Sequence, residues 1–133
     1  MLRETVREAA TRFGDALAYD GWDGQLTYTE LDARSDAIAA GLAARGVGDR
    51  DVVALRLPSG IGYFLAYVGV VKVGAACAGV NPKLAPAEQD VLVDRVDPAL
   101  VIDEPTLAEL GAFEQEQPVR THPVRGVVPE VEP

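Results

Sequence analysis

The chain has 133 residues, of which 48% are hydrophobic and 25% are charged, and its net charge is −9. These proportions are typical of one globular domain or part of one, and they exclude a wholly disordered chain, a collagen and a coiled coil. Residues 103–133 contain seven of the 21 acidic residues but only two of the 12 basic ones. Because no basic patch is available to attract phosphate backbones, we expect no nucleic-acid partner.

The cysteine content and the N-terminus favour a cytoplasmic protein. Cys77 is the single cysteine, so no intrachain disulfide can form, and the charged N-terminus lacks the apolar core of a signal peptide. The segment from Ser59 to Val80 carries only one charge, Lys72, and is long enough to cross a bilayer. Gly74 and the small residues after it instead favour a helix end followed by a buried strand, so we expect no membrane span. Membrane attachment through this segment is the weaker alternative.

The first third of the chain predicts a helix, a hairpin and a second helix. Residues 2–13 place apolar side chains on one helical face, and two short strand candidates, 16–19 and 25–27, flank a turn rich in Gly and Asp. Thr27 and Glu30 fit a capping box, and Gly46 is suited to close the helix that follows. The predicted inward side chains of this helix are Leu31, Ile38 and Leu42, and the predicted outer ones are Asp32, Arg34 and Asp36.

From residue 52 the pattern alternates between strands and helices. The predicted strands are 52–57, 75–80 and 99–102, and the predicted helices are 61–73 and 87–96, with Pro86 at the first helical position and Val91, Leu92 and Val96 facing inward. Helical crossovers between buried strands require parallel pairing. The sequence therefore predicts an α/β fold with an open, mainly parallel sheet and flanking helices.

The character of the chain changes after Asp103. Residues 106–113 can form one more helix, but the following prolines interrupt any regular element, at Pro118, Pro123, Pro129 and Pro133. We therefore divide the chain into a domain over 1–103 and an acidic, proline-rich tail over 104–133 that we expect to be poorly ordered.

Residues with obvious catalytic chemistry are scarce. His122 is the only histidine and lies in the proline-rich tail, where nothing would hold it as a general base. Cys77 sits among small apolar residues, which indicates a buried thiol and not a nucleophile. One cysteine and one histidine cannot form a zinc site. We therefore predict no catalytic, cofactor-binding or metal-binding residue in this chain.

Two weaker patterns also favour structure over chemistry. Gly60 and Gly62 follow a strand and precede a helix, as in a dinucleotide-binding turn, but Leu65 stands where a third glycine is needed and no acidic residue follows at the expected spacing. The carboxylate pairs Asp49/Asp51 and Asp20/Asp23 are typical of solvated turns.

Several short motifs, taken in order, resemble the N-terminal part of the adenylate-forming (AMP-binding) acyl-CoA synthetases, the long- and medium-chain fatty-acid–CoA ligases included. The likeness covers about residues 1–103 and departs from the family at three positions, where this chain has Arg50 in place of Gly, Ser59 in place of Asn, and no acidic residue near Gly62. We expect Arg50 to strain a turn that prefers glycine. The motifs are Leu26-Thr27-Tyr28-Thr29-Glu30-Leu31, Ala40-Gly41-Leu42, Arg45-Gly46-Val47, Asp51 before Val53-Ala54-Leu55, Ala66-Tyr67, Lys72-Val73-Gly74-Ala75, Val80-Asn81-Pro82 and Pro86-Ala87-Glu88.

The resemblance implies a ligase that uses ATP and Mg²⁺ to convert a carboxylate into an acyl-adenylate, from which coenzyme A displaces AMP. In the family, the Gly/Ser/Thr-rich phosphate loop, the acyl pocket and the catalytic lysine lie further along the chain, so Lys72 and Lys83 are not assigned to these roles. We expect the 133 residues alone to lack this activity and to associate with the remainder of the enzyme. The alternative is a non-catalytic interaction module that pairs with another chain or forms a homo-oligomer, since a truncated sheet has uncovered edges.

Overall fold

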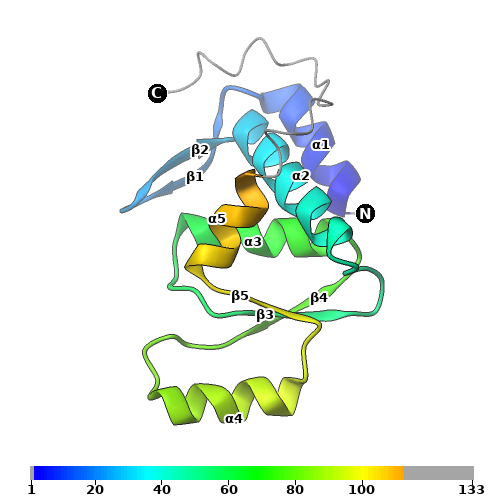
Figure 1. Cartoon of the computed structure of the whole chain (residues 1–133). Coiled ribbons are helices and arrows are strands. Elements are labelled where there is room, and N and C mark those ends of the chain that lie inside the picture. Colours follow the sequence, from blue (N-terminus) through cyan, green and yellow to red (C-terminus); the bar gives the residue numbers. More distant parts are fainter. Residues whose placement is uncertain (1, 113–133) are drawn as a thin grey trace.

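The computed structural model describes residues 2–112, and Figure 1 shows them as a layered α/β arrangement. A small sheet lies between helix α4 on one face and a group of helices on the other. The element order matches the predicted order, with each boundary within a few residues of the predicted one. The elements are α1 (Leu2–Phe13), β1 (Leu17–Gly21), β2 (Gly24–Thr27), α2 (Tyr28–Ala44), β3 (Val52–Leu55), α3 (Ile61–Lys72), β4 (Ala76–Gly79), α4 (Pro86–Val96), β5 (Leu100–Ile102) and α5 (Glu104–Ala112).

The parallel sheet has the order β4-β3-β5, and both outer strands run parallel to β3. The connection through α3 leads from β3 to β4 on one side, and the connection through α4 leads back across β3 to β5. Because both crossovers are right-handed by rule, they lie on opposite faces of the sheet, as Figure 1 shows. The loops that follow β3 and β5 both lead to helices on the same face of the sheet, α3 and α5, so they lie next to each other at the carboxyl ends of these adjacent strands. The predicted fold class is confirmed.

The two ends of α2 follow the predicted local chemistry. The Thr27 hydroxyl accepts a hydrogen bond from the Glu30 N–H at 3.1 Å, and the Glu30 carboxylate accepts one from the Thr27 N–H at 2.8 Å. This reciprocal pair satisfies two N–H groups that have no partner inside the helix. At the other end Gly46 takes a φ of 84°, a conformation that favours glycine, and closes the helix.

The hydrophobic core lies between the sheet and the helical layer of α2, α3 and α5. Val53 and Leu55 of β3, together with Leu42 and Leu110, are completely buried there. The close fit of α5 on α2 depends on Gly41, because a Cβ at this position would lie 2.9 Å from Leu110 Cδ2. Helix α5 is the additional helix that the sequence predicts after Asp103. The domain boundary proposed at Asp103 stays a prediction.

The opposite face of the sheet is covered less completely. Helix α4 has no buried residue, and Val91, predicted to face inward, is 53% exposed. That prediction is wrong for Val91, whereas Leu92 and Val96 are partly buried. An amphipathic pattern alone fixes which residues share a face, but burial of that face needs a complete layer of neighbours.

Within residues 2–112, none of the helices combines the length and the apolar character needed to cross a lipid bilayer.

Candidate functional site

The N-terminus of α3 is held by a carboxylate from the tip of the β1–β2 hairpin. The Ile61 N–H donates to Asp23 Oδ2 at 2.8 Å, and the Tyr19 hydroxyl donates to Asp23 Oδ1 at 2.9 Å. The hydrogen bond from Ile61 lowers the pKa of Asp23, and the bond from Tyr19 acts in the same direction. Gly60, the residue before α3, has no side chain with which to cap the helix, so Asp23, which lies 38 positions before Ile61, takes over this function.

This contact explains why the Gly60–Gly62 turn does not resemble a phosphate site. A helix N-terminus attracts anions through its free N–H groups, but here a carboxylate already occupies that position. A Cβ at Gly60 would lie 2.5 Å from Asp23 Oδ2, so the glycine makes room for the carboxylate. The described residues at this turn therefore do not fit the phosphates of a nucleotide, and we derive no reaction step there.

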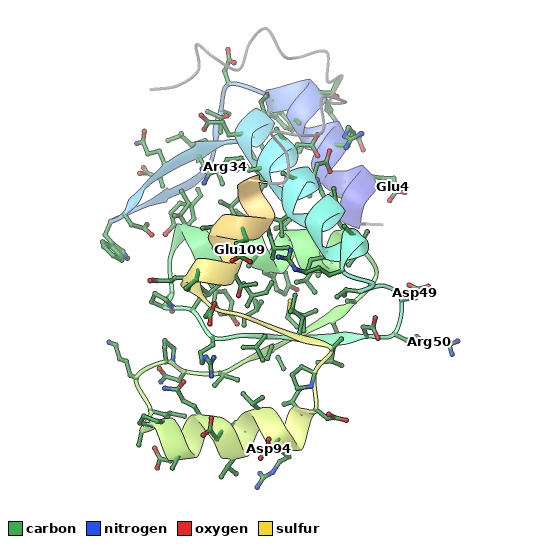
Figure 2. The ribbon with its side chains drawn as sticks, in the orientation of Figure 1. Glu4, Arg34, Asp49, Arg50, Asp94 and Glu109 are labelled. Atoms are coloured by element: carbon green, nitrogen blue, oxygen red, sulfur yellow. The ribbon has the colours of Figure 1, made fainter. Side chains whose placement is uncertain are left out.

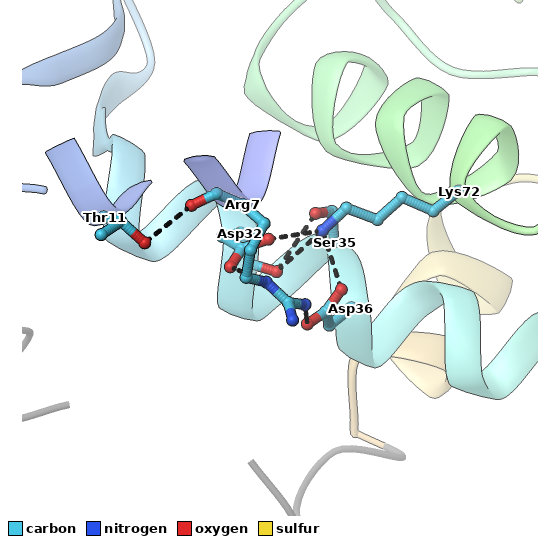
Figure 3. A network of polar contacts seen from close by, with 6 residues as sticks. All are labelled: Arg7, Thr11, Asp32, Ser35, Asp36 and Lys72. Carbon is cyan, nitrogen blue, oxygen red and sulfur yellow. Dashed lines mark hydrogen bonds and ion pairs between the residues drawn. The ribbon is translucent and has the colours of Figure 1, made fainter. Parts of the chain in front are cut away.

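A second polar cluster links α1, α2 and α3 (Figure 3). Lys72 Nζ lies 2.8 Å from Asp32 Oδ1 and 2.8 Å from Asp36 Oδ1, and its side chain has no exposed surface. Arg7 of α1 approaches the same two carboxylates, with its Nε 2.9 Å from Asp32 Oδ2. Two cations therefore balance two anions in what we call the ion cluster, Arg7, Asp32, Asp36 and Lys72.

The ion cluster corrects one prediction made from the sequence. Asp32 was predicted on the outer side of its helix but is completely buried, and Asp36 is partly buried. The reason is that α2 is packed by α1 on one side and by α3 and α5 on others, so it has no wide solvent face. Lys72 is engaged by carboxylates inside the protein, and its lack of a catalytic role stays a prediction.

The remaining candidate residues lie apart from one another, mostly in turns. The Asp51 carboxylate accepts a hydrogen bond from the Gly48 N–H at 2.8 Å, and the Lys83 N–H donates to Asn81 Oδ1 at 2.9 Å. Burial raises the pKa of Cys77 to about 11, so its thiol is a poor nucleophile at neutral pH. His122 lies outside the described residues. In the part of the chain that the structure describes, no group of three His, Cys, Asp or Glu residues is arranged to hold a metal ion.

A concave feature lies beside the loop after β3 and the helix after β5. A cavity of about 720 Å³ is bounded by the loop after β3, by α5 directly after β5, by α2 and by the hairpin tip. Its volume falls within the range of about 300–1,000 Å³ typical of small-molecule pockets. We call it the β3–β5 cavity; it is lined by Trp22, Asp23, Arg34, Ala37, Ile38, Leu57, Pro58, Ser59, Gly60, Ile61, Gly62, Tyr63, Leu65, Glu104, Leu107, Ala108 and Gly111.

The walls of the β3–β5 cavity are mainly apolar, with charges at separate points. Ile38, Leu57 and Leu65 form buried parts of the wall, whereas Trp22 at the hairpin tip is 86% exposed. Sequence reasoning did not find this cavity, because it depends on how α5 and the hairpin approach each other across α3. The only signal in the sequence was the order of strands and helices, which predicts a crevice after the carboxyl ends of the strands.

Comparison with known proteins identifies the family. The family described as "AMP-binding enzyme" matches residues 6–132 of this chain. The chain belongs to this family. Nonribosomal peptide synthetase anaPS of Neosartorya fischeri is 30% identical over 105 residues, which are 79% of this chain and 4% of that protein. The predicted relation to AMP-binding enzymes is thus confirmed at the level of the family.

Two solved structures share the fold of this chain. The N-terminal subdomain of Klebsiella oxytoca NpsA, in complex with anthranilyl-AMSN, superposes with a TM-score of 0.69 at 22% identity over 77% of this chain and 27% of that one. A benzoate CoA ligase from Burkholderia xenovorans gives a TM-score of 0.70 at 21% identity over 86% of this chain and 24% of that one. The chain therefore spans about a quarter of the length of these structures.

Proposed function

We propose that this chain forms the N-terminal part of an ATP-dependent, carboxylate-activating ligase. The observation that carries the proposal is the family match, which extends over residues 6–132. Enzymes of this kind use ATP and Mg²⁺ to join a carboxylate to AMP and release pyrophosphate. In such an enzyme the present residues build the outer part of the first α/β subdomain, where the ion cluster and the capped helices α2 and α3 supply a rigid frame.

In its finer form the proposal is that the parent enzyme is an acyl-CoA synthetase. The likeness to a benzoate CoA ligase supports coenzyme A as the acceptor of the acyl group. The likeness to anaPS instead supports a nonribosomal peptide synthetase. We favour the synthetase because the sequence motifs resemble that family, and we place it in the cytoplasm because its single cysteine suits a reducing compartment.

We further propose that residues 1–133 alone do not adenylate carboxylic acids. The Gly60–Gly62 turn is closed by Asp23, and Lys72 is neutralised inside the protein, so neither is available to bind phosphate. Activity then requires association with the remainder of the enzyme, and the edges of β4 and β5 in the described sheet are suitable places for that contact.

ATP–pyrophosphate exchange tests both parts of this proposal. The purified 133-residue chain is assayed with a panel of fatty and aromatic acids, first alone and then co-expressed with the segment encoded directly downstream. We expect no acid-dependent exchange from the chain alone and acid-dependent exchange from the combination. Exchange by the chain alone would refute the proposed inactivity. A downstream segment without a Gly/Ser/Thr-rich phosphate loop, and without activity in combination, would refute the proposed ligase.

The second candidate function is a non-catalytic module that pairs with another chain. It is favoured by the incomplete cover of the α4 face, where Val91 is exposed and α4 has no buried residue. Size-exclusion chromatography with light scattering tests it. A homo-oligomer at micromolar concentration would support this function, and a stable monomer would count against it.

A further inference from the structure

We propose that the β3–β5 cavity binds a small organic anion with an apolar body, whose anionic group lies at Arg34. The proposal goes beyond the ligase function proposed above and does not depend on it. Two observations point to it. The cavity has the size of a ligand pocket, and Arg34, the one cation of its lining, stands beside mainly apolar walls.

The apolar part of such a ligand has a suitable wall. Ile38 of α2, Leu57 after β3 and Leu65 of α3 lie at its inner boundary but are each only 3% exposed, so more of the apolar surface open to a ligand comes from the partly buried Leu107 of α5. The exposed indole of Trp22 stands at the rim, where it can cover a bound molecule and remove its own ring from water. Each of these side chains comes from a different element, so the wall exists only in the folded chain.

Arg34 supplies the cationic group. It is the single Lys or Arg in the cavity lining, it is exposed, and among the described residues it forms none of the ion pairs found for the neighbouring Arg7 and Arg45. Figure 2 places it near the C-terminal end of α5. A guanidinium group presents a planar array of donors that matches a carboxylate or another planar anion.

The two acidic residues of the lining do not displace this assignment. Both oxygens of Asp23 already accept hydrogen bonds from Ile61 and Tyr19. Glu104 is the first residue of α5, and Gly111, at the other end of this helix, also lines the cavity. Seven residues of helical rise separate the two by ~10 Å along the helix axis. At that distance physiological salt screens most of the repulsion between exposed charges. A ligand that places its anionic group at Arg34 and points its apolar part toward Glu104 is therefore attracted by the guanidinium group. Its apolar part contacts the apolar wall between these two residues.

Three matched compounds test the head group: 4-phenylbutyrate, 4-phenylbutanol and 4-phenylbutylamine, which share the phenyl ring and its alkyl chain. They are titrated into the ¹⁵N-labelled full chain, and the indole N–H signal of Trp22 is followed, since Trp22 is the single tryptophan. We expect 4-phenylbutyrate to cause a saturable shift of this signal and of amides around the cavity, and to bind about tenfold more tightly than the alcohol, the scale of one charge-assisted hydrogen bond. The amine should bind no more tightly than the alcohol.

Two charge variants and one blocking variant complete the test. Arg34→Gln should weaken 4-phenylbutyrate to the affinity of the alcohol, while Arg45→Gln, which removes the same charge directly after the end of α2 and outside the cavity, should leave the affinity unchanged. Ala108→Phe fills the cavity from an exposed position and should abolish binding of both compounds without disturbing the core. The proposal is overturned if wild type shows no saturable shift, if the amine binds as tightly as the acid, or if Arg34→Gln and Arg45→Gln have equal effects.

Discussion

Lys72 and Asp32 form an ion pair in which neither side chain has more than 1% of its surface exposed to solvent. The two residues lie 40 positions apart, on α3 and α2, and Arg7 brings α1 to the same carboxylate. Removing charges from water is costly, and the cost is offset only where each charge is balanced and hydrogen-bonded. The ion cluster satisfies this condition with two cations and two anions, so it fixes the relative positions of three helices.

Replacement of Lys72 by methionine is therefore expected to destabilise the protein strongly. The substitution keeps most of the volume but leaves two carboxylates near a single, partly exposed arginine. Removal of one partner from a buried pair costs about 3–5 kcal/mol. The free energy of unfolding, measured by urea titration with circular dichroism, should fall by this amount, or the variant should be unfolded without denaturant.

Lys83→Met is the matched control, because Lys83 is an exposed lysine in the turn after β4. Surface substitutions of this kind usually change stability by less than about 0.5 kcal/mol. If Lys72→Met lost no more stability than Lys83→Met, the ion cluster would not contribute to the fold as we describe.

The contact between Asp23 and Ile61 predicts a pH-dependent contribution to stability. The hydrogen bond from the Ile61 N–H lowers the pKa of Asp23 in the folded chain below its unfolded value. A lowered folded pKa stabilises the folded state above the unfolded pKa, near 3.8, and this contribution disappears as the pH falls through the folded pKa. Asp23→Asn should therefore be less stable than wild type at about pH 6 and approach it at about pH 2.

Equilibrium unfolding at several pH values measures this difference. Asp20→Asn serves as the control, since it removes a carboxylate from the same hairpin without contacting α3, and its difference from wild type should vary less with pH. A constant gap between Asp23→Asn and wild type from about pH 2 to 6 would contradict the proposed linkage.

Replacement of Arg50 by glycine is expected to raise the stability of the protein, unlike the substitutions above. The φ of Arg50 is 73°, in the left-handed region where a Cβ clashes with the backbone, as expected at a position where the family has glycine. Arg50→Gly relieves this strain but makes the unfolded chain more flexible, so a net gain of about 0.5–1 kcal/mol is expected. Gly46→Ala, at a φ of 84°, should lose a similar amount. Thermal and urea unfolding measure both changes, and a loss of stability in Arg50→Gly would show that its side chain makes a stabilising contact.

The features that the sequence predicted well are local ones. The capping box at Thr27 and Glu30, the helix end at Gly46 and the strain at Arg50 each depend on a few neighbouring residues, so their geometry follows from residue type and spacing. The order of strands and helices was predictable for the same reason, and with it the parallel sheet.

The features that the sequence did not predict depend on which elements meet. Asp32 looks like a surface residue until α1 and α3 are packed against α2, when its carboxylate becomes the centre of the ion cluster. Asp23 looks like part of a solvated turn until the hairpin folds over α3. The ion cluster and the contact of Asp23 with Ile61 both arise from such long-range contacts. The spacing of residues along the chain does not predict them.

Cys77 gives a chemical measure of how closed the sheet is in the absence of any partner. Burial raises the pKa of its thiol to about 11, which leaves about one thiolate per thousand molecules at pH 8, compared with roughly a quarter for an unperturbed cysteine. Alkylation by iodoacetamide requires the thiolate, so the folded chain should react about two orders of magnitude more slowly than the chain in urea. The rate can be followed by mass spectrometry, with a small-molecule thiol in the same buffers to correct for the effect of urea. Because β4 is an edge strand in the described sheet, a folded rate near that of the unfolded chain would mean that β4 detaches readily and that its pairing with β3 needs another chain for support.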